Sequence, residues 1–189
     1  MKQAIFIILV ITSLFLVSSC SSSNPLEVEN DAVSRQVKNE DNNIKESPYI
    51  KQLPIDKQNS YARFKEEKNL SALYSFTPEE MVLVYLYCLS IDDADSLYEI
   101  TFHDDQLPDK DKFIHDYEKY VMNYESVIAI HSNYYNAIKI DERTLNENSV
   151  MVIISDDARS SAKSVALMLQ KEDQVWKIDF YSQMKKYIK

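Results

Sequence analysis

The pattern of apolar and polar positions divides the chain into a hydrophobic leader, a polar stretch and a long region of regular periodicity. Residues 1–19 carry one positive charge, at Lys2, followed by mostly apolar residues and then small residues before Cys20. This order is typical of a signal peptide, and its apolar core is short for a membrane-spanning helix. Residues 20–59 are rich in Ser, Asn, Glu, Asp and Lys without periodicity, so we expect a flexible tether there.

The next segment, residues 60–75, is open to two interpretations. Its apolar residues are Tyr61, Phe64, Leu70, Leu73 and Tyr74. They fit either a short helix or a linker that docks on the domain. We therefore place the folded domain at residues 76–189.

The domain opens with a strong helix-start signal. Thr77 and Glu80 have the spacing of a capping box, and Pro78 occupies the first helical position. Phe76 and Met81 occupy the two positions of a hydrophobic staple. The residues from Met81 onward are apolar on nearly all sides, which predicts a central, buried helix.

Two further helices are expected before the pattern changes. The first runs from about Asp93 to Thr101 and is capped by Asp92 or Asp93. The second begins after Pro108, where apolar residues recur at helical spacing from Phe113 onward.

A period of two then replaces the helical period. The β-rich runs are residues 126–131, 134–141, 149–155, 163–171 and 175–181. In the last run Trp176, Ile178 and Phe180 share one face, while Lys177 and Asp179 lie on the opposite, polar face. Helices first and strands later predict a segregated α+β domain with an antiparallel, meandering sheet.

Composition excludes several classes of site. The chain has no glycine, so it can hold neither a P-loop, nor a dinucleotide fingerprint, nor a glycine-flanked nucleophile elbow. Turns with positive φ must then use Asn or Asp, or be avoided. The formal net charge of −9 disfavours nucleic-acid binding, which needs a basic surface. Cys88 lies in an apolar run and is expected to be a buried structural thiol.

The leader ends in a recognisable motif. Val17-Ser18-Ser19-Cys20 resembles the bacterial lipobox, which implies cleavage before Cys20 and attachment of lipid to its thiol. Two or more acyl chains hold a protein stably at a membrane. The alternative is an ordinary secretory leader with an incidental cysteine.

A second resemblance concerns the domain, over about residues 76–182. Thr77-Pro78-Glu79-Glu80 leads into a hydrophobic helix, Asp92-Asp93-Ala94 opens a second helix, and Gln174 to Asp179 form a closing strand. This order resembles the NTF2-like (cystatin-like, cone-shaped) fold. The resemblance implies an α+β domain of three N-terminal helices packed on a curved antiparallel sheet of four to six strands. It also implies a cone whose open end can hold a small ligand.

No residue pattern predicts catalysis, a metal or a cofactor. The three histidines His103, His115 and His131 lack the spacing of metal ligands, and the acidic stretch from Asp104 to Asp111 lacks the glycine of an EF-hand. We interpret that stretch as a solvated acidic face. The candidates for a pocket or a binding surface are Tyr85, Tyr117, Tyr120, His131 and Tyr134.

These observations predict a membrane-anchored, surface-exposed lipoprotein on the extracytoplasmic side of the cell membrane. Its domain is expected to act as a binding or interaction module in the cell envelope, with an envelope protein as partner and no nucleic acid. The alternative is a small-ligand carrier or receptor that uses the cone. A pocket enzyme is a further hypothesis, which the fold by itself does not support.

Overall fold

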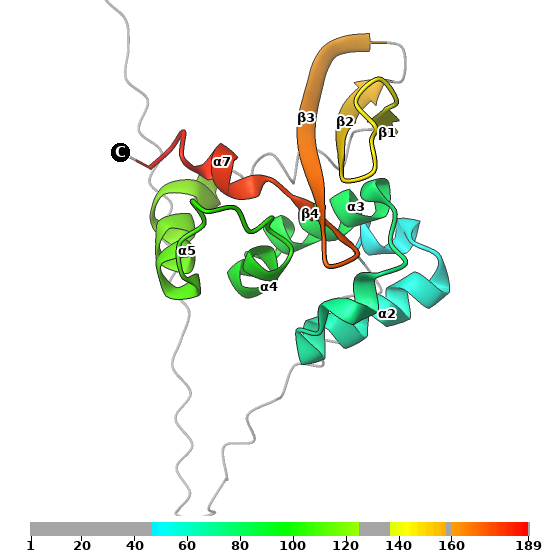
Figure 1. Ribbon diagram of the computed structural model, residues 1–189. Helices are drawn as coiled ribbons and strands as arrows, with labels where there is room; N and C mark the ends of the chain where they lie inside the picture. The colour runs from blue at the N-terminus through cyan, green and yellow to red at the C-terminus, as the bar shows by residue number, and fades with distance from the viewer. Residues whose placement is uncertain (1–46, 125–136, 158–159, 189) are drawn as a thin grey trace, which may run out of the picture. The chain divides into compact units, whose positions relative to one another are not determined.

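The structure, a computed structural model, describes residues 47–124, 137–157 and 160–188 (Figure 1). Within this part of the chain a set of helices precedes a four-stranded antiparallel sheet, which confirms the predicted α+β class. The strand expected at 126–131, and the first residues of the strand expected at 134–141, lie outside the described residues.

The elements follow one another in simple order. The helical elements are η1 (Ile50–Gln52), α2 (Ile55–Glu67), η2 (Leu70–Leu73), α3 (Pro78–Ser90), α4 (Ala94–Glu99), α5 (Lys110–Asp116) and a π-helical turn, η3 (Tyr117–Val121). The strands are β1 (Ala137–Asp141), β2 (Ser149–Asp157), β3 (Ser160–Glu172) and β4 (Val175–Ile178), followed by α7 (Phe180–Met184). The three predicted helices are thus α3, α4 and α5.

Helix α3 begins at the expected signal and is the centre of the core. The Thr77 hydroxyl accepts from the Glu80 amide at 3.3 Å, and the Glu80 carboxylate accepts from the Thr77 amide at 2.8 Å. Every residue from Met81 to Leu89 is buried, as predicted for a helix that is apolar on all sides. The sheet covers one side of α3, since the helix contacts β1, β2 and β4.

The segment preceding α3 is part of the domain, so the expected tether boundary at residue 59 is wrong. Tyr49, Ile50 and Leu53 are buried in the core, and α2 begins at Ile55. Residues 60–75, left open between helix and linker, contain the rest of α2 and the short η2 helix. This segment has few apolar residues, but Tyr61, Phe64 and Leu73 are fully buried.

Tyr61 is the main contact of α2 with α3. Its ring meets the Tyr87 ring edge-on at 5.6 Å between centroids, and its hydroxyl lies 3.7 Å from the Cys88 sulfur. Burial raises the pKa of the Cys88 thiol to about 12, in keeping with the structural role predicted for it.

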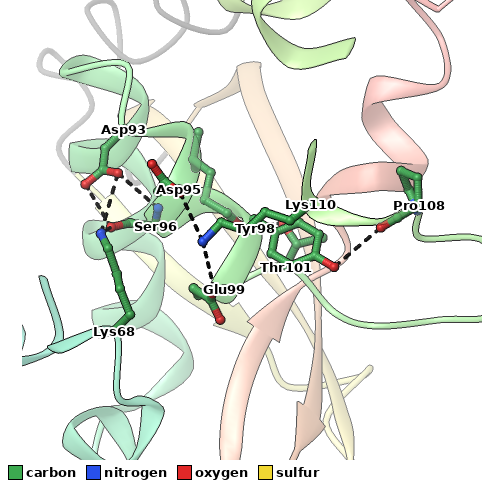
Figure 2. A network of polar contacts seen from close by, with 10 residues as sticks. Lys68, Asp93, Asp95, Ser96, Tyr98, Glu99, Thr101, Pro108 and Lys110 are labelled. Carbon is green, nitrogen blue, oxygen red and sulfur yellow. Dashed lines mark hydrogen bonds and ion pairs between the residues drawn. The ribbon is translucent and has the colours of Figure 1, made fainter. Parts of the chain in front are cut away.

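Two lysines hold the ends of α2. The Lys57 ammonium donates to Ser75 at 2.8 Å and lies 4.8 Å from the centre of the Phe76 ring. The Lys68 ammonium donates to Ser96 at 2.6 Å and lies 3.7 Å from the Asp93 carboxylate (Figure 2). One end of α2 is therefore tied to the start of α3, and the other end to the start of α4.

The strands form a meander in the order β1-β2-β3-β4. Val152 pairs with Leu167, and Val150 with Leu169, so their buried side chains form the inner face against α3. The β3–β4 turn achieves positive φ without glycine, at Asp173 (48°) and Gln174 (71°). Lys68 and Asp92 also have positive φ. Positive φ is therefore adopted by lysine and glutamine as well as by aspartate, the residue type predicted for such turns.

The last strand ends sooner than predicted. β4 pairs with β3 only from Leu169 to Glu172, and the chain turns at Asp179 into α7 (Figure 1). The expected strand at 175–181 is therefore wrong after Ile178. Phe180 enters the helix-covered core instead, where its ring packs 5.3 Å from that of Tyr85.

The docking of α2 can be tested at Tyr61, which is fully buried. We expect Tyr61→Ala to lower the free energy of unfolding by about 3–5 kcal/mol, as for other buried aromatic residues. Tyr74→Ala is the matched control, because that side chain is 48 % exposed and its loss should change the free energy by about 0.5 kcal/mol or less. Urea denaturation of both variants provides the measurement, and equal losses would show that α2 is not packed on α3.

Candidate functional site

Two of the tyrosines predicted to line a pocket lie in the core of the described part of the chain. Tyr85 and Tyr117, two of the predicted pocket residues, are buried and pack on Phe180 with ring centroids at 5.3 and 6.2 Å. Tyr120 is partly buried, with the Lys119 ammonium 4.7 Å from its ring centre. His131 and Tyr134 lie outside the described residues. Tyr85 and Tyr117 are therefore core residues, and a pocket or surface role for the whole set stays a prediction.

A recess of about 390 Å³ opens instead between the sheet and α7. We call it the α7 recess. Its sheet wall consists of Met151, Val165, Ala166 and Met168, and its helix wall consists of Asp179, Ser182, Gln183, Lys186 and Tyr187. The volume lies in the range of small-ligand pockets. Its β3 residues belong to the part of that strand that does not pair with β4, and Figure 1 shows β3 continuing past the end of β4.

The helix wall is polar. Ser182 and Gln183 lie within α7, Asp179 is its N-cap residue, and Lys186 follows its C-cap residue Lys185. Phe180 and Met184 are buried on the other face. Backbone hydrogen bonds continue the helical path after Met184, from the Lys185 amide to the Tyr181 carbonyl at 3.1 Å and onward.

These four polar side chains are not engaged elsewhere in the described part of the chain. Asp179 occupies the N-cap position of α7, yet its side chain accepts no capping hydrogen bond. Among the described residues, no hydrogen bond or ion pair involves the side chains of Ser182, Gln183 or Lys186. The lining of the recess therefore includes one carboxylate, that of Asp179, and one ammonium, that of Lys186.

The sheet wall is formed chiefly by two methionines. Met151 and Met168 are direct partners in the β2–β3 register, so their side chains lie side by side on the face turned away from the buried valines. Both are partly exposed. Methionine is flexible and polarizable and adapts to ligands of different shape. Tyr187 closes the rim, where its ring stacks on that of Tyr124 at 5.1 Å.

The lining of the α7 recess contains few kinds of polar group. Its lining contains neither histidine nor cysteine. In the part of the chain that the structure describes, no group of three His, Cys, Asp or Glu residues could hold a metal ion. The arrangement offers two opposite charges, a hydroxyl and an amide facing an apolar wall.

A second polar cluster lies at the β3–β4 turn and corrects the prediction for Lys177. The alternation of the strand predicted an outward, polar position, but Lys177 is only 1 % exposed. Its ammonium lies 3.1 Å from the Glu172 carboxylate, which also accepts from the His103 amide at 2.9 Å. The segment containing Thr101 runs parallel to β4 and covers its edge, so this face is not open to solvent.

Glu172 is the centre of this cluster. Partial burial raises the pKa of its carboxyl, but the His103 amide and the Lys177 ammonium outweigh this effect and hold the pKa below its usual range. The His103 ring nitrogen Nδ1 is also close, at 3.3 Å. The cluster fastens the segment after α4 to the hairpin and thus has a structural role.

Many acidic residues around the predicted acidic face, within residues 93–116, have structural partners. Lys110 bridges Asp95 at 3.0 Å and Glu99 at 3.2 Å, and Figure 2 shows these contacts. Asp93 and Asp109 cap α4 and α5 through their side chains. Asp116 is buried and paired with Lys112 at 2.6 Å. Much of this acidity therefore stabilises the helical layer.

Comparison of the chain with protein-family models gives no match, and comparisons with curated proteins and with solved structures give none either. Among the described residues, none of the helices has the length and apolar character needed to span a membrane.

The Glu172–Lys177 pair provides a test of the second cluster. We expect Glu172→Gln to cost about 3 kcal/mol of unfolding free energy, because it leaves a buried ammonium without its carboxylate. Lys177→Met removes both the charge and its need for a partner, so it should change stability by about 1 kcal/mol or less. Chemical denaturation would measure both variants, and a Lys177→Met loss as large as that of Glu172→Gln would contradict this account.

The same pair predicts a dependence on pH. Because the pKa of Glu172 is lower in the folded protein, its contribution is present above the pKa of the unfolded chain and is lost as the pH falls through the folded value. Stability of the wild type should therefore decline in acid, below about pH 4, more steeply than that of the variant carrying both Glu172→Gln and Lys177→Met.

Proposed function

We propose that this protein is a membrane-anchored, surface-exposed lipoprotein whose NTF2-like domain acts as a binding module in the cell envelope. The lipobox-like ending of the leader supports an anchor at Cys20. The helices followed by a four-stranded antiparallel meander support the NTF2-like fold. The α7 recess is the observation that carries the binding role, because four polar side chains without a described partner converge on it.

The position of the recess favours a module over a carrier that encloses its ligand in the cone. A carrier of that kind needs space between the helices and the inner face of the sheet. Phe180, Tyr85 and Tyr117 fill that region with packed rings. The α7 recess lies between the helix and the sheet edge, where a partner can approach from solvent without opening the core.

The anchor is tested by growing cells with a labelled fatty acid. We expect label on the wild-type chain and none on Cys20→Ala, which should also leave the membrane fraction because its membrane attachment depends on the acyl chains. Cys88→Ala is the matched control and should stay labelled, since that thiol is buried in the domain. An unlabelled wild type would contradict the anchor.

The binding role is tested by blocking the α7 recess. We expect Gln183→Trp to reduce recovery of an envelope partner from solubilised membranes by about tenfold, which corresponds to 1.4 kcal/mol of binding free energy. Glu147→Trp, in the exposed loop between β1 and β2, controls for the added indole and should leave recovery unchanged. Thermal unfolding would verify that both variants fold, and the same proteins recovered with all three chains would refute the role of the recess.

A further inference from the structure

The surface formed by η3, the residues after it and the segment around α7 combines tyrosine rings with lysines. η3 contacts α7, and Figure 1 shows α5 beside α7. We call it the tyrosine–lysine surface, and it consists of Tyr120, Tyr124, Tyr181, Lys185, Lys186 and Tyr187. Tyr124, Lys185 and Lys186 are exposed, and the other three side chains are partly buried.

Ring and cation contacts hold these side chains together. The Tyr124 ring is 61 % exposed and stacks on the Tyr187 ring, with 5.1 Å between centroids. The Lys185 ammonium lies 5.4 Å from the centre of the Tyr181 ring. The Tyr120 and Tyr181 hydroxyls both lie close enough to the Lys112 ammonium to interact with it electrostatically. The two helical segments therefore present their tyrosines on one surface.

The charge of this surface is opposite to that of the chain. The formal net charge of the chain is −9, whereas residues 180–188 contain two lysines and no acidic residue. Neither Lys185 nor Lys186 forms an ion pair within the part of the chain that the structure describes, and the Lys185 ammonium donates to the neutral Gln106 amide oxygen at 2.6 Å. In α5 and η3, lysines and acidic residues are equal in number. The local excess of positive charge therefore comes from Lys185 and Lys186.

We infer that the tyrosine–lysine surface docks the domain on the anionic phospholipid headgroups of the membrane that holds the chain. This inference rests on the proposed membrane anchor. Lysines near a membrane surface are attracted to anionic lipids. Tyrosine is favoured at the membrane–water interface, because its ring is apolar and its hydroxyl remains in contact with water. Both contributions act in the same orientation of the domain, since rings and ammonium groups share one surface.

The proposed anchor brings this surface within reach of the lipid. Residues 21–46 separate Cys20 from Ser47, the first described residue, and span at most about 90 Å at full extension. A domain held at this distance meets the lipid at a high effective concentration, so contacts too weak to join separate molecules suffice. Docking also places the α7 recess beside the lipid, because Lys186 and Tyr187 belong to its lining as well. The partner expected at the recess is then one that lies in or on the membrane.

The experiment measures how closely two points of the domain approach the lipid. The full chain is reconstituted through its own anchor into vesicles of phosphatidylcholine, with or without an equal part of phosphatidylglycerol. Nitroxide groups on the lipid headgroups quench a fluorophore attached to Asn123→Cys, beside Tyr124, or to the matched control Asn59→Cys on α2. Both positions are exposed. The wild-type chain, treated in the same way, reports any fluorophore on its own cysteines.

We expect phosphatidylglycerol to increase the quenching at position 123 by about twofold or more, because the two lysines are attracted to anionic headgroups. The quenching at position 59 should not change. In 1 M salt the increase at position 123 should disappear, because charges are then screened beyond about 3 Å.

Two double variants assign the charge contact. Lys185→Gln combined with Lys186→Gln should remove the increase at position 123. Lys51→Gln combined with Lys139→Gln is the matched control, because it removes the same charge from exposed positions outside the surface and should retain the increase. Thermal unfolding would verify that both double variants fold.

A second comparison assigns the ring contact. Tyr124→Ser should reduce the quenching at position 123, because it removes the exposed ring that stacks on Tyr187. Tyr74→Ser changes another exposed tyrosine, outside the surface, and should leave the quenching unchanged.

The inference is overturned if position 123 is quenched no more than position 59, or if its quenching is independent of phosphatidylglycerol and salt. Equal losses in the two double variants would overturn it as well. The vesicles contain no other protein, so a surface that binds a protein instead of lipid would give no increase. A fatty-acid label on Cys20 with no increase at position 123 would remove the docking alone, whereas a chain without that label would refute the proposed anchor.

Discussion

Helix α3 is apolar on every side, and such a helix is stable in water only when other elements bury all of its faces. The arrangement of the other helices and of the sheet follows from the need to bury α3. The inner face of the sheet covers one side through residues such as Val152 and Leu167. The opposite side would remain exposed if the domain began at α3. Helix α2 contributes cover through Tyr61, which contacts Tyr87 and Cys88 of α3, and η1 also contacts α3. The polar segment before the expected domain boundary is therefore needed by the hydrophobic core, and its two end lysines fix its position.

The features that depend on local sequence could be predicted. The capping box at Thr77, the N-caps at Asp93 and Asp109 and the strand alternation are short-range patterns whose physical causes lie within a few residues. Helix α2 could not be predicted in the same way, because few of its residues are apolar and its stability comes from contact with α3. The end of β4 could not be predicted either, because it depends on a distant contact. Phe180 packs on Tyr85 in the core once the chain leaves the strand and enters α7.

The candidate site escaped prediction for the same reason. The spacing of Asp179, Ser182, Gln183 and Lys186 is visible in the sequence, but on its own it describes the solvated face of a short helix. It becomes a recess because Met168 of β3 lies opposite, a contact that no local pattern indicates. Conversely, Tyr85 and Tyr117 have the chemistry expected of pocket residues, but both are buried in the core.

The distribution of ion pairs separates structural charges from the charges of the site. Asp95, Glu99 and Asp116 lie beside lysines, and Glu172 holds the buried Lys177. Lys110 of α5 joins Asp95 and Glu99 of α4, Lys112 and Asp116 pair within α5, and Lys177 and Glu172 pair across the β3–β4 turn, so these carboxylates already serve the fold. Asp179 and Lys186 both line the α7 recess, one just before the first residue of α7 and one after its C-cap residue, and neither has an ion pair among the described residues. Their charges therefore contribute no described ion pair to the fold, in contrast to those of the helical layer and the β3–β4 turn.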